Sequence, residues 1–107
     1  GKKSSVPNPE VILTPSMIVS PDRKTVLPGE TVELDSFGGT STVYYAFSHN
    51  RSGGGLSNQT GAAIDYVAGN VASNVDIVEA WDAENLLGRT FMNVISPWER
   101  EFLLLNV

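Results

Sequence analysis

Short runs of alternating apolar and polar residues, separated by turn residues, dominate this sequence. Between residues 10 and 95, Pro, Gly, Asn or Asp interrupts the runs at intervals of about 8–12 residues. In the segment 31–35, Val32 and Leu34 fall on one side of an extended chain while polar side chains fall on the other. This pattern predicts strands that each bury one face. The expected fold class is therefore all-β, with two packed sheets.

The runs and the turns between them set the expected order of elements. The predicted strands cover residues 10–14, 17–20, 24–27, 31–35, 42–48, 63–67, 75–82 and 89–95. Pro28 followed by Gly29 predicts a type II turn, because Gly accepts the positive φ that this turn requires. The segment 52–61 is too rich in glycine to hold a strand, and we expect a mobile loop there. The acidic, Asn and Gly residues of 82–88 predict a hairpin loop.

The chain has the length of one domain. Its 107 residues can bury one two-layer core but not two. Residues 1–9 contain two prolines and no periodicity, which predicts an extended tether. Residues 10–95 form the expected sandwich, and residues 96–107 an extension that packs on the domain or on a partner. The first residues lack the apolar core of an export signal, so we expect a mature protein or an excised piece.

Charge and composition exclude several classes of partner. Twelve acidic and seven basic residues give a net charge of -5, and no strip of basic residues could neutralise a row of phosphates. We therefore expect no nucleic acid partner. No run of about 18 apolar residues exists, so we expect no membrane span. The absence of cysteine excludes disulfides, thiol catalysis and cysteine-based metal sites, and it leaves the redox compartment open.

The order of several motifs resembles the bacterial immunoglobulin-like modules, in their polycystic-kidney-disease-like and cadherin-like variants, over about residues 16–95. The matching segments are Val-Ser-Pro at 19–21, the Pro-Gly turn and strand at 26–34, Thr-Gly at 60–61, Tyr-Val-Ala-Gly at 66–69, the alternating strand and Asp at 75–82, and Gly88. Their order and spacing together carry the resemblance, since each motif alone is weak.

The resemblance implies an immunoglobulin-like β-sandwich of about seven to nine antiparallel strands, with an extra C-terminal strand or short helix. It also implies a non-catalytic module of an exported or cell-surface bacterial protein, located outside the cell, at its surface or in the periplasm. Such a module acts as a structural spacer or as a protein-contact and adhesion domain. Its expected partners are neighbouring immunoglobulin-like modules or another protein, including a second copy of itself.

One outer face departs from the family pattern. The family register points Val78 and Ala80 inward. The same register points four large apolar side chains outward: Ile77, Trp81, Phe91 and Ile95. At the first three of these positions the family carries Thr or Ser, and at the fourth its last strand ends. Leaving such side chains in water forfeits roughly 1.5–3 kcal/mol each, so we predict a protein-contact face. In the reversed register, Ile77 and Trp81 would instead lie in the core.

The C-terminal residues fit two structures. Ser96 and Glu99 can form a capping box and Pro97 suits the first helical position, which together predict a short helix. Such a helix would align an apolar stripe that extends the predicted contact face: Trp98, Phe102 and Leu105. The run 102–107 also has the length of a buried strand that could pair with 10–14. The run of apolar residues favours the strand.

No arrangement of residues predicts catalysis. The single histidine, His49, adjoins the glycine-rich loop, where we expect it to be solvated, and no nucleophile-elbow motif is present. We therefore expect no enzyme activity. Acidic turn residues could bind calcium as in cadherin-like relatives, but they lack EF-hand spacing. These residues are Asp22, Glu30, Asp82 and Glu84. We assign no metal site and no cofactor, and calcium stays open.

Two further functions remain as alternatives. Exposed aromatic side chains in a row could form a carbohydrate-binding platform. The candidates for that platform are Tyr44, Tyr45, Tyr66, Trp81 and Trp98. Core packing is the preferred role for Tyr45 and Phe47, which share a face with Val43. The other alternative is an accessory domain of a larger secreted enzyme.

Overall fold

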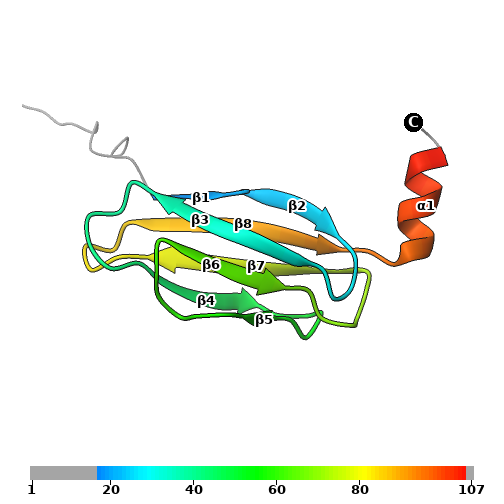
Figure 1. The fold of residues 1–107 in the computed structure, drawn as a ribbon, viewed down its shortest axis with the longest axis horizontal. Helices are drawn as coiled ribbons and strands as arrows, with labels where there is room; N and C mark the ends of the chain where they lie inside the picture. The colour runs from blue at the N-terminus through cyan, green and yellow to red at the C-terminus, as the bar shows by residue number, and fades with distance from the viewer. Residues whose placement is uncertain (1–16, 106–107) are drawn as a thin grey trace, which may run out of the picture.

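The computed structural model describes residues 17–105, which form two sheets packed face to face and one helix (Figure 1). The elements are β1 (Ile18–Ser20), β2 (Arg23–Val26), β3 (Thr31–Phe37), β4 (Tyr44–His49), β5 (Gly55–Leu56), β6 (Ala63–Val67), β7 (Asn74–Trp81), β8 (Leu87–Val94) and α1 (Pro97–Leu105). The prediction of a mostly β chain with two packed sheets is confirmed. The predicted tether at 1–9 and the strand at 10–14 lie outside the described residues.

The eight strands divide equally between the sheets. Sheet I has the order β1-β3-β6-β5, and sheet II has the order β2-β8-β7-β4. Neighbouring strands run antiparallel except β2 and β8, which are parallel. The prediction of an entirely antiparallel sandwich is therefore wrong at this pair. The chain passes from sheet I to sheet II between β1 and β2, and β2 then runs beside the last strand in the same direction.

The core lies between the sheets and contains one side of each long strand. Its completely buried apolar side chains include Leu34 and Tyr66 from sheet I and Ala80, Met92 and Val94 from sheet II. Ala80 and Val78 of β7 point inward, as the predicted register required. Burying each large side chain contributes roughly 1.5–3 kcal/mol, so this interior is the main source of stability.

The turn before β3 has the positive φ at Gly29 that the sequence predicted. Gly29 has a φ of +83°, and the Glu30 N–H donates to the Leu27 carbonyl at 3.1 Å. The Glu30 carboxylate also accepts from the Leu27 N–H at 2.8 Å. The predicted Pro-Gly turn is confirmed, because a residue with positive φ occupies its third position.

The glycine-rich segment differs from its prediction. It contains the short strand β5, which pairs with β6, so the prediction that it holds no strand is wrong. At Gly54 a Cβ atom would lie 2.6 Å from the Val67 carbonyl oxygen, and at Gly69 it would lie 2.0 Å from the Ser52 carbonyl oxygen. These glycines allow two backbone segments to approach closely. The glycine content of this segment had instead indicated a mobile loop.

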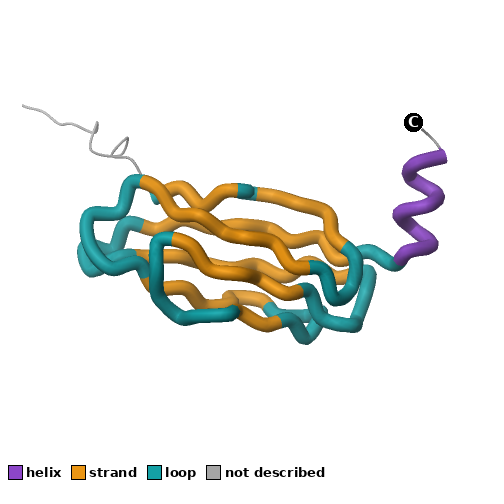
Figure 2. The backbone as a smooth tube through the Cα atoms, in the orientation of Figure 1, coloured by secondary structure: helices purple, strands orange, loops and turns teal. Residues whose placement is uncertain are grey.

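The C-terminal segment is a helix. The Ser96 N–H donates to the Glu99 carboxylate at 2.9 Å, and the Glu99 N–H donates to Ser96 Oγ at 3.1 Å. This capping box and Pro97 define where the helix begins, so the preference for a strand at 102–107 is wrong through residue 105. The helix α1 stands away from the end of the sandwich (Figure 2). None of its residues is buried, and it is not long and apolar enough to span a membrane.

Candidate functional site

The outer face of sheet II brings together three of the predicted contact residues. Ile77 and Trp81 of β7 and Phe91 of β8 point outward and are each half-buried. Ile77 lies directly opposite Phe91 in the strand register. We use the name "contact face" for these three side chains together with Tyr44 and Leu87, which lie at the Trp81 end of the same surface.

The Trp81 end of the contact face is an aromatic pair. Tyr44 of β4 lies opposite Trp81, and their rings are stacked with centroids 6.1 Å apart and planes 25° apart. Leu87 lies opposite Trp81 on the other side, in β8. Tyr44 is 40% exposed and Leu87 is 37% exposed, so the domain covers each of them only in part. Side-by-side aromatic and aliphatic groups of this kind are favoured at protein interfaces.

An ion pair divides the contact face into two apolar parts. Arg89 Nε lies 2.8 Å from the Glu79 carboxylate, and the two residues lie opposite each other between the Trp81 end and the Phe91 end. More than half of the Arg89 side chain is exposed, so the pair contributes little to stability. It gives the surface a polar centre that a partner would have to match.

Ile95 does not belong to this face. It is only 5% exposed, and its N–H donates to the Val26 carbonyl at 2.9 Å. The strand β8 ends at Val94, so the alternation of sides stops there and both Val94 and Ile95 are buried. The prediction that Ile95 points outward is therefore wrong.

Trp98 and Phe102 lie on α1 rather than on the sheet. Five large apolar side chains of this nine-residue helix are more than half exposed. Their exposed fractions are 74% for Trp98, 56% for Phe102, 54% for Leu103, 63% for Leu104 and 79% for Leu105. A groove on the helix surface is lined by Trp98, Glu99, Phe102 and Leu103. Exposed apolar surface of this density is unusual in a domain that works alone.

Polar contacts fix the base of α1 against the domain. Ser73 Oγ donates to the Glu99 carboxylate at 3.1 Å, and Arg100 Nη1 lies 3.5 Å from the Glu30 carboxylate. The N–H of Ser96, followed by the hydroxyls of Ser73 and Ser96, lowers the pKa of Glu99 below its usual value. The first turn of the helix is thus held in place while its apolar residues remain accessible.

A second cluster of polar side chains, from an aspartate, a serine and a tyrosine, is buried inside the sandwich. Asp76 is completely buried and accepts hydrogen bonds from the Ser52 N–H at 2.9 Å, from Ser52 Oγ, and from the Tyr66 hydroxyl at 2.7 Å. Ser52 Oγ in turn accepts from the Gly69 N–H at 2.9 Å. Burial, and then the adjacent Asp76 carboxylate, raises the pKa of Tyr66. These groups bond to one another with no solvent access, which fits a structural role for the cluster.

Two of the four acidic turn residues, Asp82 and Glu30, accept hydrogen bonds from protein donors. Asp82 is almost completely buried and accepts from the N–H groups of Thr40, Glu84 and Leu86 at 2.9, 3.0 and 3.0 Å. These bonds lower the pKa of Asp82, and the bond from the Thr40 N–H has the largest effect. Within residues 17–105, no group of three or more His, Asp or Glu residues could hold a metal ion.

His49 is exposed at the end of β4, as expected, and its Nδ1 lies 3.4 Å from Ser48 Oγ. Of the aromatic residues proposed for a sugar platform, Tyr45 and Tyr66 are buried. Tyr44, Trp81 and Trp98 remain on the surface, but Trp98 is on α1 and does not continue a row with the other two.

The sequence did not lead us to predict that Tyr44 belongs to the contact face or that Asp76 forms a buried cluster. Tyr44 follows from alternation with the inward Tyr45, so the pattern contained this signal. Asp76 occupies an inward position of an alternating strand, which is a signal for a buried polar contact, but its partner Ser52 is distant in the sequence. No protein-family model matches the chain, no curated protein matches its sequence, and no solved structure matches it.

Proposed function

We propose that this chain is a non-catalytic immunoglobulin-like module of an exported or cell-surface bacterial protein, where it acts as a structural spacer or as a protein-contact and adhesion domain. The observation that carries the proposal is the cluster of exposed apolar side chains on α1, a helix held at its base but not covered by the sandwich. A surface of this kind is stabilised when a partner protein covers it.

The strand order supports the immunoglobulin-like assignment. Immunoglobulin-like sandwiches place strands A, B, E and D in one sheet and C, F and G in the other. If β1 and β3–β8 are taken as A to G, sheet I has the order A-B-E-D, and sheet II contains G-F-C. The additional strand β2 lies beside β8 at the edge of sheet II.

The positions of the first and last described elements support a spacer role. The chain enters β1 near one end of the sandwich and leaves β8 for α1 at the opposite end (Figure 1). Modules connected through such opposite ends extend a chain lengthwise, so that each adds its own length to the distance spanned. The contact face of sheet II would lie along the side of such an array.

Self-association tests the contact role directly. We expect the wild-type protein to form dimers or larger assemblies at about 0.1 mM, a concentration at which weak interfaces assemble. Light scattering after gel filtration would compare it with the triple variant Trp98→Ser, Leu104→Ser, Leu105→Ser. The variant should be a monomer with an unchanged melting temperature, because none of the three side chains is buried in the domain.

Two further variants separate the helix from the sheet. Trp81→Asp and Phe91→Asp place charges on the contact face and leave α1 intact. If they, rather than the helix variant, dissociate the assembly, the contact lies on sheet II. A wild-type protein that stays monomeric at this concentration, and whose α1 residues show no change in amide signals with dilution, would contradict association through either surface.

A further inference from the structure

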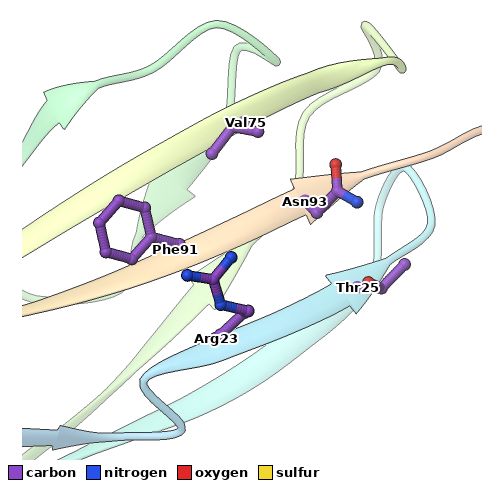
Figure 3. A pocket seen from close by; sticks show the side chains of 5 residues that line it. All are labelled: Arg23, Thr25, Val75, Phe91 and Asn93. Atoms are coloured by element: carbon purple, nitrogen blue, oxygen red, sulfur yellow. The ribbon is translucent and has the colours of Figure 1, made fainter.

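A shallow groove crosses the outer face of sheet II at the end opposite Trp81. It has a volume of about 360 Å³, and its five lining residues come from three adjacent strands (Figure 3). They are Arg23 and Thr25 of β2, Val75 of β7, and Phe91 and Asn93 of β8. A volume near 300 Å³ is at the lower end of the range for small-ligand sites.

The strand register places these side chains together. Arg23 lies beside Phe91 and Thr25 beside Asn93 in the parallel pair, while Val75 lies opposite Asn93 in the antiparallel pair. Because successive side chains alternate between faces, residues two apart on each strand share the outer face. The groove is therefore built on strands of the sandwich rather than on loops.

The cation in the groove is held in position and forms no ion pair with any acidic side chain of residues 17–105. The guanidinium carbon of Arg23 lies 5.3 Å from the centroid of the Phe91 ring, and its planar head points across β8 between Phe91 and Asn93 (Figure 3). In the described part of the chain, the ion pairs are Arg89 with Glu79 and Arg100 with Glu30. The guanidinium N–H donors of Arg23 are thus available to a ligand, in a protein whose net charge is -5.

The neighbouring polar groups are also available. Within residues 17–105, the side chains of Thr25 and Asn93 make no hydrogen bond to the protein. The groove therefore offers a guanidinium, an amide and a hydroxyl beside the apolar side chain of Val75. Guanidinium binds carboxylate through two parallel hydrogen bonds, while amide and hydroxyl groups bind ring hydroxyls.

We infer that this groove binds a uronate unit of an acidic polysaccharide, with the carboxylate on Arg23 and the ring hydroxyls on Asn93 and Thr25. Val75 would contact the carbon-bound hydrogens of the ring. The site goes beyond the proposed protein-contact role and does not use α1. An acidic peptide fits less well, because peptides gain much of their affinity by pairing with a strand edge, whereas the five side chains that line this groove lie on the face of the sheet.

Titration with trigalacturonate, followed by backbone amide signals in NMR, tests the inference. We expect shifts at Thr25, Val75 and Asn93 with a dissociation constant on the order of millimolar, as suits one ring in an open groove. The neutral trisaccharide maltotriose should produce no such shifts. Binding should weaken as NaCl rises from about 50 to 500 mM, because salt screens the exposed guanidinium.

Arg23→Gln should raise the dissociation constant about tenfold or more, since a charge-assisted pair is lost. Lys24→Gln is the matched control, because it removes the same charge from the next residue of β2, which is not in the groove. Asn93→Ala gives a second, independent loss of affinity. Equal weakening by the Arg23 and Lys24 variants, or equal binding of maltotriose, would overturn the inference. Equal binding of tetraglutamate with the same dependence on Arg23 would overturn the saccharide assignment.

Discussion

At the scale of single residues, the buried carboxylates explain more of this fold than the exposed ones. Asp76 connects β7 to Ser52 in the glycine-rich segment and to Tyr66 in the opposite sheet. Asp82 similarly connects the end of β7 to Thr40. Each buried carboxylate accepts several hydrogen bonds from protein donors, so each links segments that are distant in the sequence.

Tyr66→Phe tests the first of these ties. The change removes one donor from a carboxylate that has no access to water, and it should lower the free energy of unfolding by about 1–3 kcal/mol. Tyr45→Phe is the matched control, because the Tyr45 hydroxyl donates to the Ala62 carbonyl over a longer 3.4 Å and does not bind a carboxylate. Urea unfolding should show a smaller loss for the control. Equal losses of unfolding free energy would mean that the hydrogen bond from Tyr66 to Asp76 stabilises the fold no more than the bond from Tyr45 to the Ala62 carbonyl.

The pH dependence of stability tests Asp82. Its folded-state pKa is lower than the unfolded value near 3.8, so its stabilisation is complete above that value and is lost as pH falls through the folded pKa. Asp82→Asn should therefore lower the melting temperature at neutral pH, and the difference from wild type should shrink below about pH 4. Calorimetric scans of both proteins measure this. A difference that is constant with pH would contradict the assigned cause.

At the scale of elements, residues with local pairing patterns were predictable and residues with distant partners were not. Alternation in β7 and β8 predicted that successive side chains face opposite sides but allowed two registers, and the family resemblance indicated the one that is observed. The turn at Gly29 follows from its own chemistry. The short strand β5 depends on pairing with β6, and the burial of Ile95 depends on a bond to β2. Neither dependence is visible in the local sequence, because the partner residues are far along the chain.

The helix α1 shows how a local signal can outweigh hydrophobicity. The run of apolar residues after Glu101 favoured a strand, but the capping box supplies bonds to N–H groups that a helix start leaves open. A nine-residue helix with no buried residue is marginal in water, so its cap has a large effect on its population.

Ser96→Ala should therefore unfold the helix but not the domain. The lost cap costs about 0.5–2 kcal/mol of helix stability, enough to make the helical form a minority. Circular dichroism near 222 nm and the amide shifts of residues 98–105 should report the loss, while the melting temperature of the sandwich stays the same. Glu101→Gln on the same helix, outside the cap, is the control. A helix that persists in Ser96→Ala would show that contacts other than the cap maintain it.

At the scale of the whole molecule, the candidate sites lie along one sandwich, and the contact face and the Arg23 groove share Phe91. The apolar helix extends from one end, the aromatic pair lies on the side of sheet II, and the Arg23 groove lies further along the same side. The sequence predicted the side chains of the sheet surface through their period. It could not predict the groove, because that requires knowing that β2 crosses to sheet II and lies beside β8.

That parallel pairing has a mechanical consequence. β2 is near the start of the described domain and β8 is its last strand, and the two run in the same direction along the long side of the sandwich. Tension that pulls the chain outward before β2 and after β8 would load their hydrogen bonds in shear. The bonds from Phe91 to Asp22 and from Ile95 to Val26 would then bear the force together rather than open one at a time. The domain would resist stretching more strongly than its thermal stability alone suggests.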